Sequence, residues 1–144
     1  MFRTMAVLAA TTFAVPAFAD GHASGDAAAG EKAFRQCISC HVVVDDAGET
    51  LAGRNAKTGP NLYAIGGRTI GSVEDFRYSD LILAAGEAGM VWDEASFVGY
   101  VQDPTKWLQE ATGESGRGKM AYKVRKEEDA VNLYAYLVSL GPTN

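Results

Sequence analysis

Two cysteines and a histidine stand together in the segment Cys37-Ile38-Ser39-Cys40-His41. Two cysteines three positions apart, with a histidine directly after the second, form the attachment pattern of a c-type haem. Thiols at this spacing can reach the two vinyl groups along one side of a porphyrin and form thioethers, and the next residue then lies beneath the iron. The pattern therefore predicts that Cys37 and Cys40 anchor one covalent haem and that His41 is an axial ligand of its iron.

Three other uses of the two thiols compete with haem attachment. A redox-active cysteine pair belongs with a βαβ pattern, and the sequence shows no clear strands. A structural zinc site takes four ligands, whereas the chain offers only two cysteines and two histidines. Inert buried thiols are the third alternative. Haem attachment is favoured because all three residues that it requires are present at the required spacing.

The first 19 residues have the features of a secretory signal peptide. Arg3 supplies a positive start, residues 5–15 an apolar run, and Ala17-Phe18-Ala19 a cleavage site. The apolar run is too short to span a bilayer, although an uncleaved membrane anchor is the alternative. We therefore expect cleavage of residues 1–19, export to the bacterial periplasm and a mature single domain over residues 20–144.

The mature chain is expected to be acidic. Residues 1–19 contain one basic side chain and no acid, so the remaining chain has 12 basic against 18 acidic side chains. No basic excess is available to neutralise phosphates, which argues against nucleic acid as a partner. Both cysteines are assigned to haem, so no structural disulfide is predicted.

Apolar periodicity and capping residues predict an all-α fold with long loops. The expected helices cover residues 26–36, 80–88, 94–102, 104–110 and 126–140. Ser24 or Asp26 is the candidate N-cap of the first helix, and Asp93 is that of the third. Pro104 opens the fourth helix, at a position that proline tolerates. Gly30 lowers the helix propensity of the first helix, and we expect a close approach by another helix there.

Between the first two helices, residues 42–72 show no sustained helical period. Six glycines and one proline punctuate this stretch into turns. Val42, Val43 and Val44 form either a short strand or coil. A loop of this length is uncommon in a compact domain unless it is functional, and a haem would provide the surface on which it packs.

The second axial position of the iron separates electron carriers from haem enzymes. Only Met90 and Met120 remain after residues 1–19 are removed, and methionine opposite histidine raises the reduction potential of a haem. Met120 lies in a loop between two helices, from which its side chain can be aimed at the haem, whereas Met90 is better explained by apolar packing. A vacant position, as in an enzyme or gas sensor, is the rival, but the other histidine, His22, lies near the mature terminus. We expect ligation by Met120, outer-sphere transfer of single electrons through the haem edge, and no catalytic residues.

Four segments resemble class I cytochromes c, and most closely cytochrome c2 of purple and related α-proteobacteria. They are CISCHVVVDD at 37–46, AGRNAKTGPNLY at 52–63, YVQDPTK at 100–106 and GKMAYK at 118–123. The resemblance implies the class I cytochrome c fold, with about five helices and long loops wrapped around one covalent haem. It also implies a periplasmic carrier that shuttles electrons from quinol–cytochrome c reductase to a photosynthetic reaction centre or a terminal oxidase.

The resemblance assigns roles around the haem as well. The carbonyl of Pro60 is expected to accept a hydrogen bond from the His41 imidazole, and the Tyr100 hydroxyl is expected to reach the methionine sulfur. Three residues are expected to hydrogen-bond or screen the haem propionates: Arg68, Tyr78 and Trp92. The helix crossing at the chain ends is expected to involve Gly30, Phe34 and Tyr136. Ordinary core packing is the alternative for the aromatic residues.

Five lysines fall in segments expected to rim the haem edge: Lys57, Lys106, Lys119, Lys123 and Lys126. In the family such lysines face acidic patches on redox partners, so we expect transient docking steered by complementary charge and a monomeric protein. A merely solvated face is the alternative. Tyr122 stands where relatives usually have phenylalanine, so its hydroxyl needs water or a partner at the haem edge.

Overall fold

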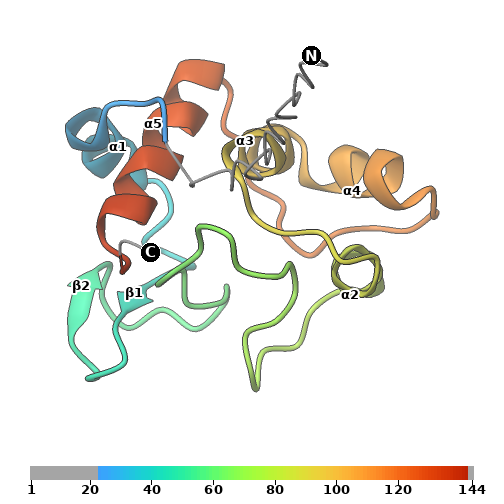
Figure 1. The fold of residues 1–144 in the computed structure, drawn as a ribbon, viewed down its shortest axis with the longest axis horizontal. Coiled ribbons are helices and arrows are strands. Elements are labelled where there is room, and N and C mark those ends of the chain that lie inside the picture. The colour runs from blue at the N-terminus through green and yellow to red at the C-terminus, as the bar shows by residue number, and fades with distance from the viewer. Residues whose placement is uncertain (1–22, 143–144) are drawn as a thin grey trace, which may run out of the picture.

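The structure is a computed structural model that describes residues 23–142. The signal peptide expected over residues 1–19 and the histidine His22 lie outside the described residues. This part of the chain forms five helices and one small hairpin, and Figure 1 shows how they are arranged. In chain order they are α1 (Ala27–Phe34), β1 (Val43–Val44), β2 (Thr50–Ala52), α2 (Asp80–Glu87), α3 (Glu94–Gln102), α4 (Pro104–Thr112) and α5 (Glu127–Ser139). No helix between residues 23 and 142 is long and apolar enough to cross a membrane.

All five expected helices are present, with ends that differ from the prediction by two residues or fewer. Local capping chemistry explains this agreement. The Asp93 carboxylate accepts a hydrogen bond from the Ser96 backbone N–H, and the Ser96 hydroxyl accepts one from the Asp93 backbone N–H, which forms a capping box. Pro104 occupies the first turn of α4, as predicted. Gly113, with a φ of 72°, ends the same helix in the left-handed conformation that glycine favours.

Helices α1 and α5 cross so closely that one position on α1 has no room for a side chain (Figure 1). A Cβ atom on Gly30 would lie 1.9 Å from the carbonyl oxygen of Asn132, which confirms the expected reason for this glycine. The Asn132 side chain also accepts a hydrogen bond of 2.8 Å from the backbone of Asp26. Asp26, rather than Ser24, caps α1. This crossing fixes where α1 ends and therefore where the Cys-His segment begins.

The small hairpin resolves one open alternative and adds a strand that was not expected. Val43 and Val44 form β1, whereas Val42 lies outside it, and β1 pairs antiparallel with β2. The turn is closed by Asp45, whose carboxylate accepts hydrogen bonds of 3.0 Å and 2.8 Å from the backbones of Ala47 and Glu49. Strands of two and three residues are too short to show a periodicity of two, so only the β-branched run was visible in the sequence. Apart from this hairpin the fold is helical, as predicted.

A short ladder of backbone bonds ties the long loop to the segment before α3. The Trp92 carbonyl accepts a hydrogen bond from Gly67 at 2.8 Å, and the Trp92 N–H donates to Arg68 at 2.9 Å. Ile70 donates to the Met90 carbonyl at 3.0 Å. The loop is therefore held in place although it has no helix of its own, and Met90 contributes to that support.

Candidate haem-binding site

A cavity of about 440 Å³ collects the residues that the sequence assigned to the haem. Nine of them line it: Cys37, Cys40, His41, Pro60, Arg68, Tyr78, Trp92, Tyr100 and Met120. Met90 is not among the lining residues, and of the five lysines only Lys119 is. Cavities of this size typically hold a cofactor or small molecule. Residues that are far apart in the sequence, from Cys37 to Met120, thus line the same cavity.

The segment after α1 presents its thiols by continuing in a turn with helical hydrogen bonds. The backbone N–H groups of Cys40 and His41 both donate to the Cys37 carbonyl, at 3.0 Å and 2.9 Å. Because residues three apart in such a turn share a face, both thiols are presented on one side. Burial, together with the nearby Cys40, raises the pKa of Cys37 to about 11.

These properties weigh against the other uses of the two cysteines. Cysteines of thiol–disulfide active sites have lowered pKa values, whereas burial raises the pKa of Cys37. Between residues 23 and 142 no group of three or more histidine, cysteine and acidic side chains could hold a metal ion. The thiols are suited to attachment of a cofactor rather than to disulfide exchange or zinc binding.

The His41 ring is oriented by the backbone of Pro60. Its Nδ1 lies 2.9 Å from the Pro60 carbonyl oxygen, and because a carbonyl only accepts, Nδ1 is the donor. Burial lowers the pKa of His41, although the bond to Pro60 acts in the opposite direction. The imidazole is therefore held neutral with the lone pair of Nε2 available, which is the form that binds a metal.

Arg68 places a positive charge in the wall of the cavity. Its guanidinium donates to the backbone carbonyls of Tyr63 at 2.6 Å and Asn61 at 3.1 Å. Burial lowers the pKa of Arg68, and the nearby Tyr78 opposes that shift. The group stays protonated at any physiological pH. A partly buried cation with spare N–H donors suits a carboxylate of the ligand.

Three aromatic rings form a cluster beside the cavity. The Trp92 ring centroid lies 5.0 Å from that of Tyr100 and 6.1 Å from that of Trp107, and Tyr100 and Trp107 are 6.0 Å apart. Burial, with a contribution from Tyr78, raises the pKa of Tyr100 to about 12, so its hydroxyl stays protonated and able to donate. Among the hydrogen bonds of the described residues, none joins Tyr100 to Met120. Its contact with the methionine sulfur therefore stays a prediction.

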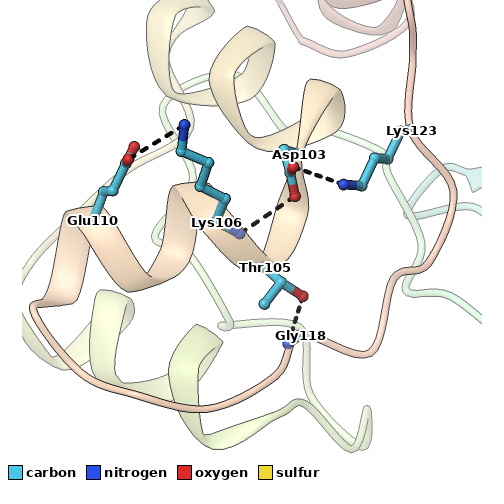
Figure 2. A network of polar contacts seen from close by, with 6 residues as sticks. All are labelled: Asp103, Thr105, Lys106, Glu110, Gly118 and Lys123. Atoms are coloured by element: carbon cyan, nitrogen blue, oxygen red, sulfur yellow. Dashed lines mark hydrogen bonds and ion pairs between the residues drawn. The ribbon is translucent and has the colours of Figure 1, made fainter.

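Met120 reaches the cavity from the irregular segment between α4 and α5, as expected. Several hydrogen bonds anchor this segment to neighbouring elements, including the three that follow. The Gly118 N–H donates to the Thr105 hydroxyl at 3.1 Å (Figure 2). The side chain of Lys119 donates to the Arg77 carbonyl at 2.7 Å, and the Val124 N–H donates to the Val101 carbonyl at 2.8 Å. The backbone on both sides of Met120 is thus fixed, whereas its thioether is free to contact a ligand.

All five lysines expected at the haem edge are exposed, and several have intramolecular partners. Figure 2 shows Asp103 between two of them. The Lys123 ammonium lies 2.6 Å from one Asp103 carboxylate oxygen, and the other oxygen accepts from the Lys106 backbone at 3.4 Å. The Lys106 ammonium lies 3.7 Å from Glu110. The structure therefore gathers at least two of these lysines, but it balances them with internal acids.

Comparison with known proteins identifies the family. The chain is 68% identical over 119 residues to the cytochrome c2 of Rhodovulum adriaticum, across 82% of this chain and 94% of that protein. It is 54% identical over 139 residues to the cytochrome c2 of Cereibacter sphaeroides, across 94% of each. The chain belongs to the cytochrome c2 family. A crystal structure of cytochrome c2 from Rhodobacter sphaeroides matches with a TM-score of 0.80 and 56% identity, covering 81% of this chain and 97% of that one. No protein-family model matches the chain.

Membership of the cytochrome c2 family settles the cofactor and the general activity. The chain carries one covalent haem c and transfers electrons. The cavity fits this group on physical grounds, since a turn with two thiols, a neutral imidazole with a free Nε2 and a buried cation all line it. The class I fold inferred from the sequence is likewise confirmed.

One residue of this cytochrome c2 site was overlooked in the sequence. Gly59 was read only as a turn residue, but a Cβ atom there would lie 2.3 Å from Cε1 of His41. Its N–H also donates to the Cys40 carbonyl at 2.7 Å. Gly59 therefore lets the loop approach the imidazole closely enough for Pro60 to orient it. Its place directly before that proline was the available signal.

Proposed function

We propose that this cytochrome c2 is a periplasmic carrier that takes single electrons from quinol–cytochrome c reductase. It delivers them to a photosynthetic reaction centre or a terminal oxidase. The observation that carries the proposal is the shared cavity of His41 and Met120. A bound haem c supplies a one-electron iron couple. If His41 and Met120 both ligate the iron, they would leave no position on it for a substrate, and the bound haem would supply outer-sphere electron transfer only.

The positions of the cavity residues support the following roles. Cys37 and Cys40 hold the haem through thioethers, which prevents its loss from an exported protein. His41 would ligate the iron through Nε2, and because its Nδ1 donates to Pro60 the ring is already oriented for that role. Met120 would provide the second ligand, a thioether that favours the reduced iron and raises the potential.

The polar residues of the cavity wall serve the acidic side of the ligand. Arg68, Tyr78 and Trp92 hydrogen-bond or screen the propionates, because an unpaired carboxylate in an apolar pocket is unstable. Tyr100 has a hydroxyl that stays protonated, and it donates toward the methionine sulfur. These residues exclude water and hold charge in place, but none transfers a proton to a substrate. The protein is accordingly not an enzyme, and it has no catalytic residue.

Docking is assigned to the exposed lysines. Lys119 lines the haem cavity, and Lys123 lines a separate surface groove. With Lys57, Lys106 and Lys126 they present positive charge to acidic patches of a redox partner, against an overall negative chain. Such charge pairs mainly raise the association rate and let the complex dissociate quickly. The carrier therefore works as a monomer in short-lived complexes.

The rival function is a haem enzyme or a gas sensor with an open iron site. Optical spectra of the ferric and ferrous holoprotein, with and without carbon monoxide, distinguish the two. The carrier shows the ferric absorption band of iron–methionine bonding and no change on adding the gas. A missing band with prompt gas binding would make the sensor or enzyme the better interpretation. Laser-flash oxidation by purified reaction centres, at low and high salt, then tests the proposed partner.

A further inference from the structure

A hydrogen bond connects the two segments that carry the proposed iron ligands. The Tyr122 hydroxyl donates to the side-chain oxygen of Gln36. Gln36 directly precedes Cys37, and Tyr122 follows Met120 by two residues. Among the described residues, no other hydrogen bond joins residues 35–41 to residues 118–124.

The remaining bonds of the Met120 segment all lead elsewhere. They reach Thr105 in α4, Val101 in α3, Asp103 between these two helices, and Arg77 in the loop before α2. These bonds hold the segment to other parts of the fold, but none of them joins it to the Cys-His turn. Tyr122 and Gln36 therefore supply a contact that the rest of the fold does not duplicate.

Burial does not explain this contact. The Tyr122 side chain is 43% exposed, so water could satisfy its hydroxyl equally well. The ring lines the haem cavity and also a neighbouring surface groove formed by residues 121–125 and Gln102. A phenylalanine would pack in the same place. What tyrosine adds is the bond to Gln36 across the mouth of the cavity.

We propose that Tyr122 and Gln36 are positioning residues that hold the Met120 segment closed over the haem and so favour ligation by Met120. This inference rests on the proposed ligation of the iron by His41 and Met120. A bond made only when the segments are together shifts the equilibrium toward the closed form. Neither residue is proposed as a ligand of the iron, and both act through the segment that bears the methionine.

Imidazole binding to the ferric holoprotein tests the proposal, because imidazole must displace Met120. Tyr122→Phe keeps the ring and removes the bond, so we expect imidazole to bind roughly two- to tenfold more tightly, the effect of one hydrogen bond. Gln36→Met should have the same effect from the other side. The double variant should bind no more tightly than either single one, since both remove the same contact.

Tyr136→Phe is the matched control, because it removes a phenol hydroxyl on α5, outside the Met120 segment. Its imidazole affinity should equal that of the unmodified protein. The proposal is overturned if Tyr122→Phe leaves the affinity unchanged, if only one of the two single variants has an effect, or if their effects add. A different failure is recognised in the unmodified protein. If that protein lacks the iron–methionine absorption band and binds imidazole as tightly as Met120→Ala does, the ligation itself is wrong.

Discussion

The two sides of the haem cavity are built in different ways. On the histidine side, the His41 ring is fixed by a hydrogen bond to Pro60 and by close contact with Gly59, which leaves no room for a side chain. On the methionine side, Met120 lies in an irregular segment held by a few hydrogen bonds, several of them exposed. The histidine side is thus enforced by sterics and the methionine side by bonds that can open. We therefore expect a substitution that crowds His41 to disrupt the site as a whole. A substitution on the methionine side should weaken the site only by the contribution of the bond that it removes.

The largest effect is expected from Gly59→Ala. Its methyl group would fall 2.3 Å from a ring carbon of His41, so the imidazole must turn and lose its bond to Pro60. We expect haem attachment to fail in most molecules, measured as haem absorbance per protein. Gly48→Ala is the control, since nothing lies within 4 Å of that position and its only penalty is its φ of 82°, about 1–2 kcal/mol. Full haem loading of Gly59→Ala would contradict this prediction, because it would mean that the loop or the His41 ring can move to make room for the methyl group.

Met120→Ala should have the next largest effect, and it should alter only the methionine side of the cavity. The thioethers and His41 remain, so the haem stays bound, but the iron loses its sulfur ligand. The reduction potential should fall and carbon monoxide should bind the ferrous protein. Redox titration and optical spectra measure both. Met90→Leu should alter neither, because Met90 does not line the cavity. An unchanged potential without gas binding would remove Met120 from the iron.

The residues on the histidine side of the cavity were easier to predict from the sequence than the contacts on the methionine side. The Cys-His motif and Pro60 lie within 24 residues of one another and carry a recognisable local pattern. Met120 could be named by elimination between two methionines. The bond from Tyr122 to Gln36 could not be named, because it joins residues 86 apart and depends on how the fold brings their side chains together.

Helices could also be predicted from the sequence more reliably than individual contacts between distant residues. Capping residues such as Asp93 placed the helix ends, since a cap acts within one turn of its own helix. The strand Thr50–Ala52 was missed because its pairing with β1 depends on a turn rather than on a repeat. The reason for Gly30 was foreseen, but its neighbour Asn132 was not. The sequence thus shows which residues need a special environment, such as Gly30. Only the fold shows which neighbouring atoms, such as those of Asn132, create that environment.

Arg68 and Lys119 each donate hydrogen bonds to backbone carbonyls, one on each side of the cavity. Replacing each in turn compares how much the two sides contribute to the free energy of unfolding. Arg68 is partly buried and donates to Asn61 and Tyr63, in the loop that follows Pro60. Arg68→Met should lower the free energy of unfolding by about 1.5–3 kcal/mol, as loss of hydrogen bonds from a charged group does. Lys119→Met removes an exposed bond to Arg77 and should lower it by less than about 1 kcal/mol. Denaturant titration of both holoproteins tests this order, and equal losses would contradict the comparison.

The smallest effect concerns the ion pair of Asp103 and Lys123 (Figure 2). The hydrogen bond from Lys123 is the main cause that holds the pKa of Asp103 below its usual value. A lowered carboxyl pKa stabilises the folded protein fully above the ordinary pKa of aspartate. This contribution is lost as the pH falls through the lowered value.

Asp103→Asn should therefore melt slightly below the unmodified protein at neutral pH, and the gap should close on acidification below the ordinary pKa of aspartate. Asparagine still caps α4, so the change isolates the charge. Glu110→Gln is the control, because Glu110 and Lys106 are 3.7 Å apart and both about two-thirds exposed, and such a pair should contribute little. A gap that persists at low pH would mean that Asp103 acts through its cap rather than through Lys123. In that case the end of the Met120 segment would be held by backbone contacts alone, and Lys123 would be free to meet a partner.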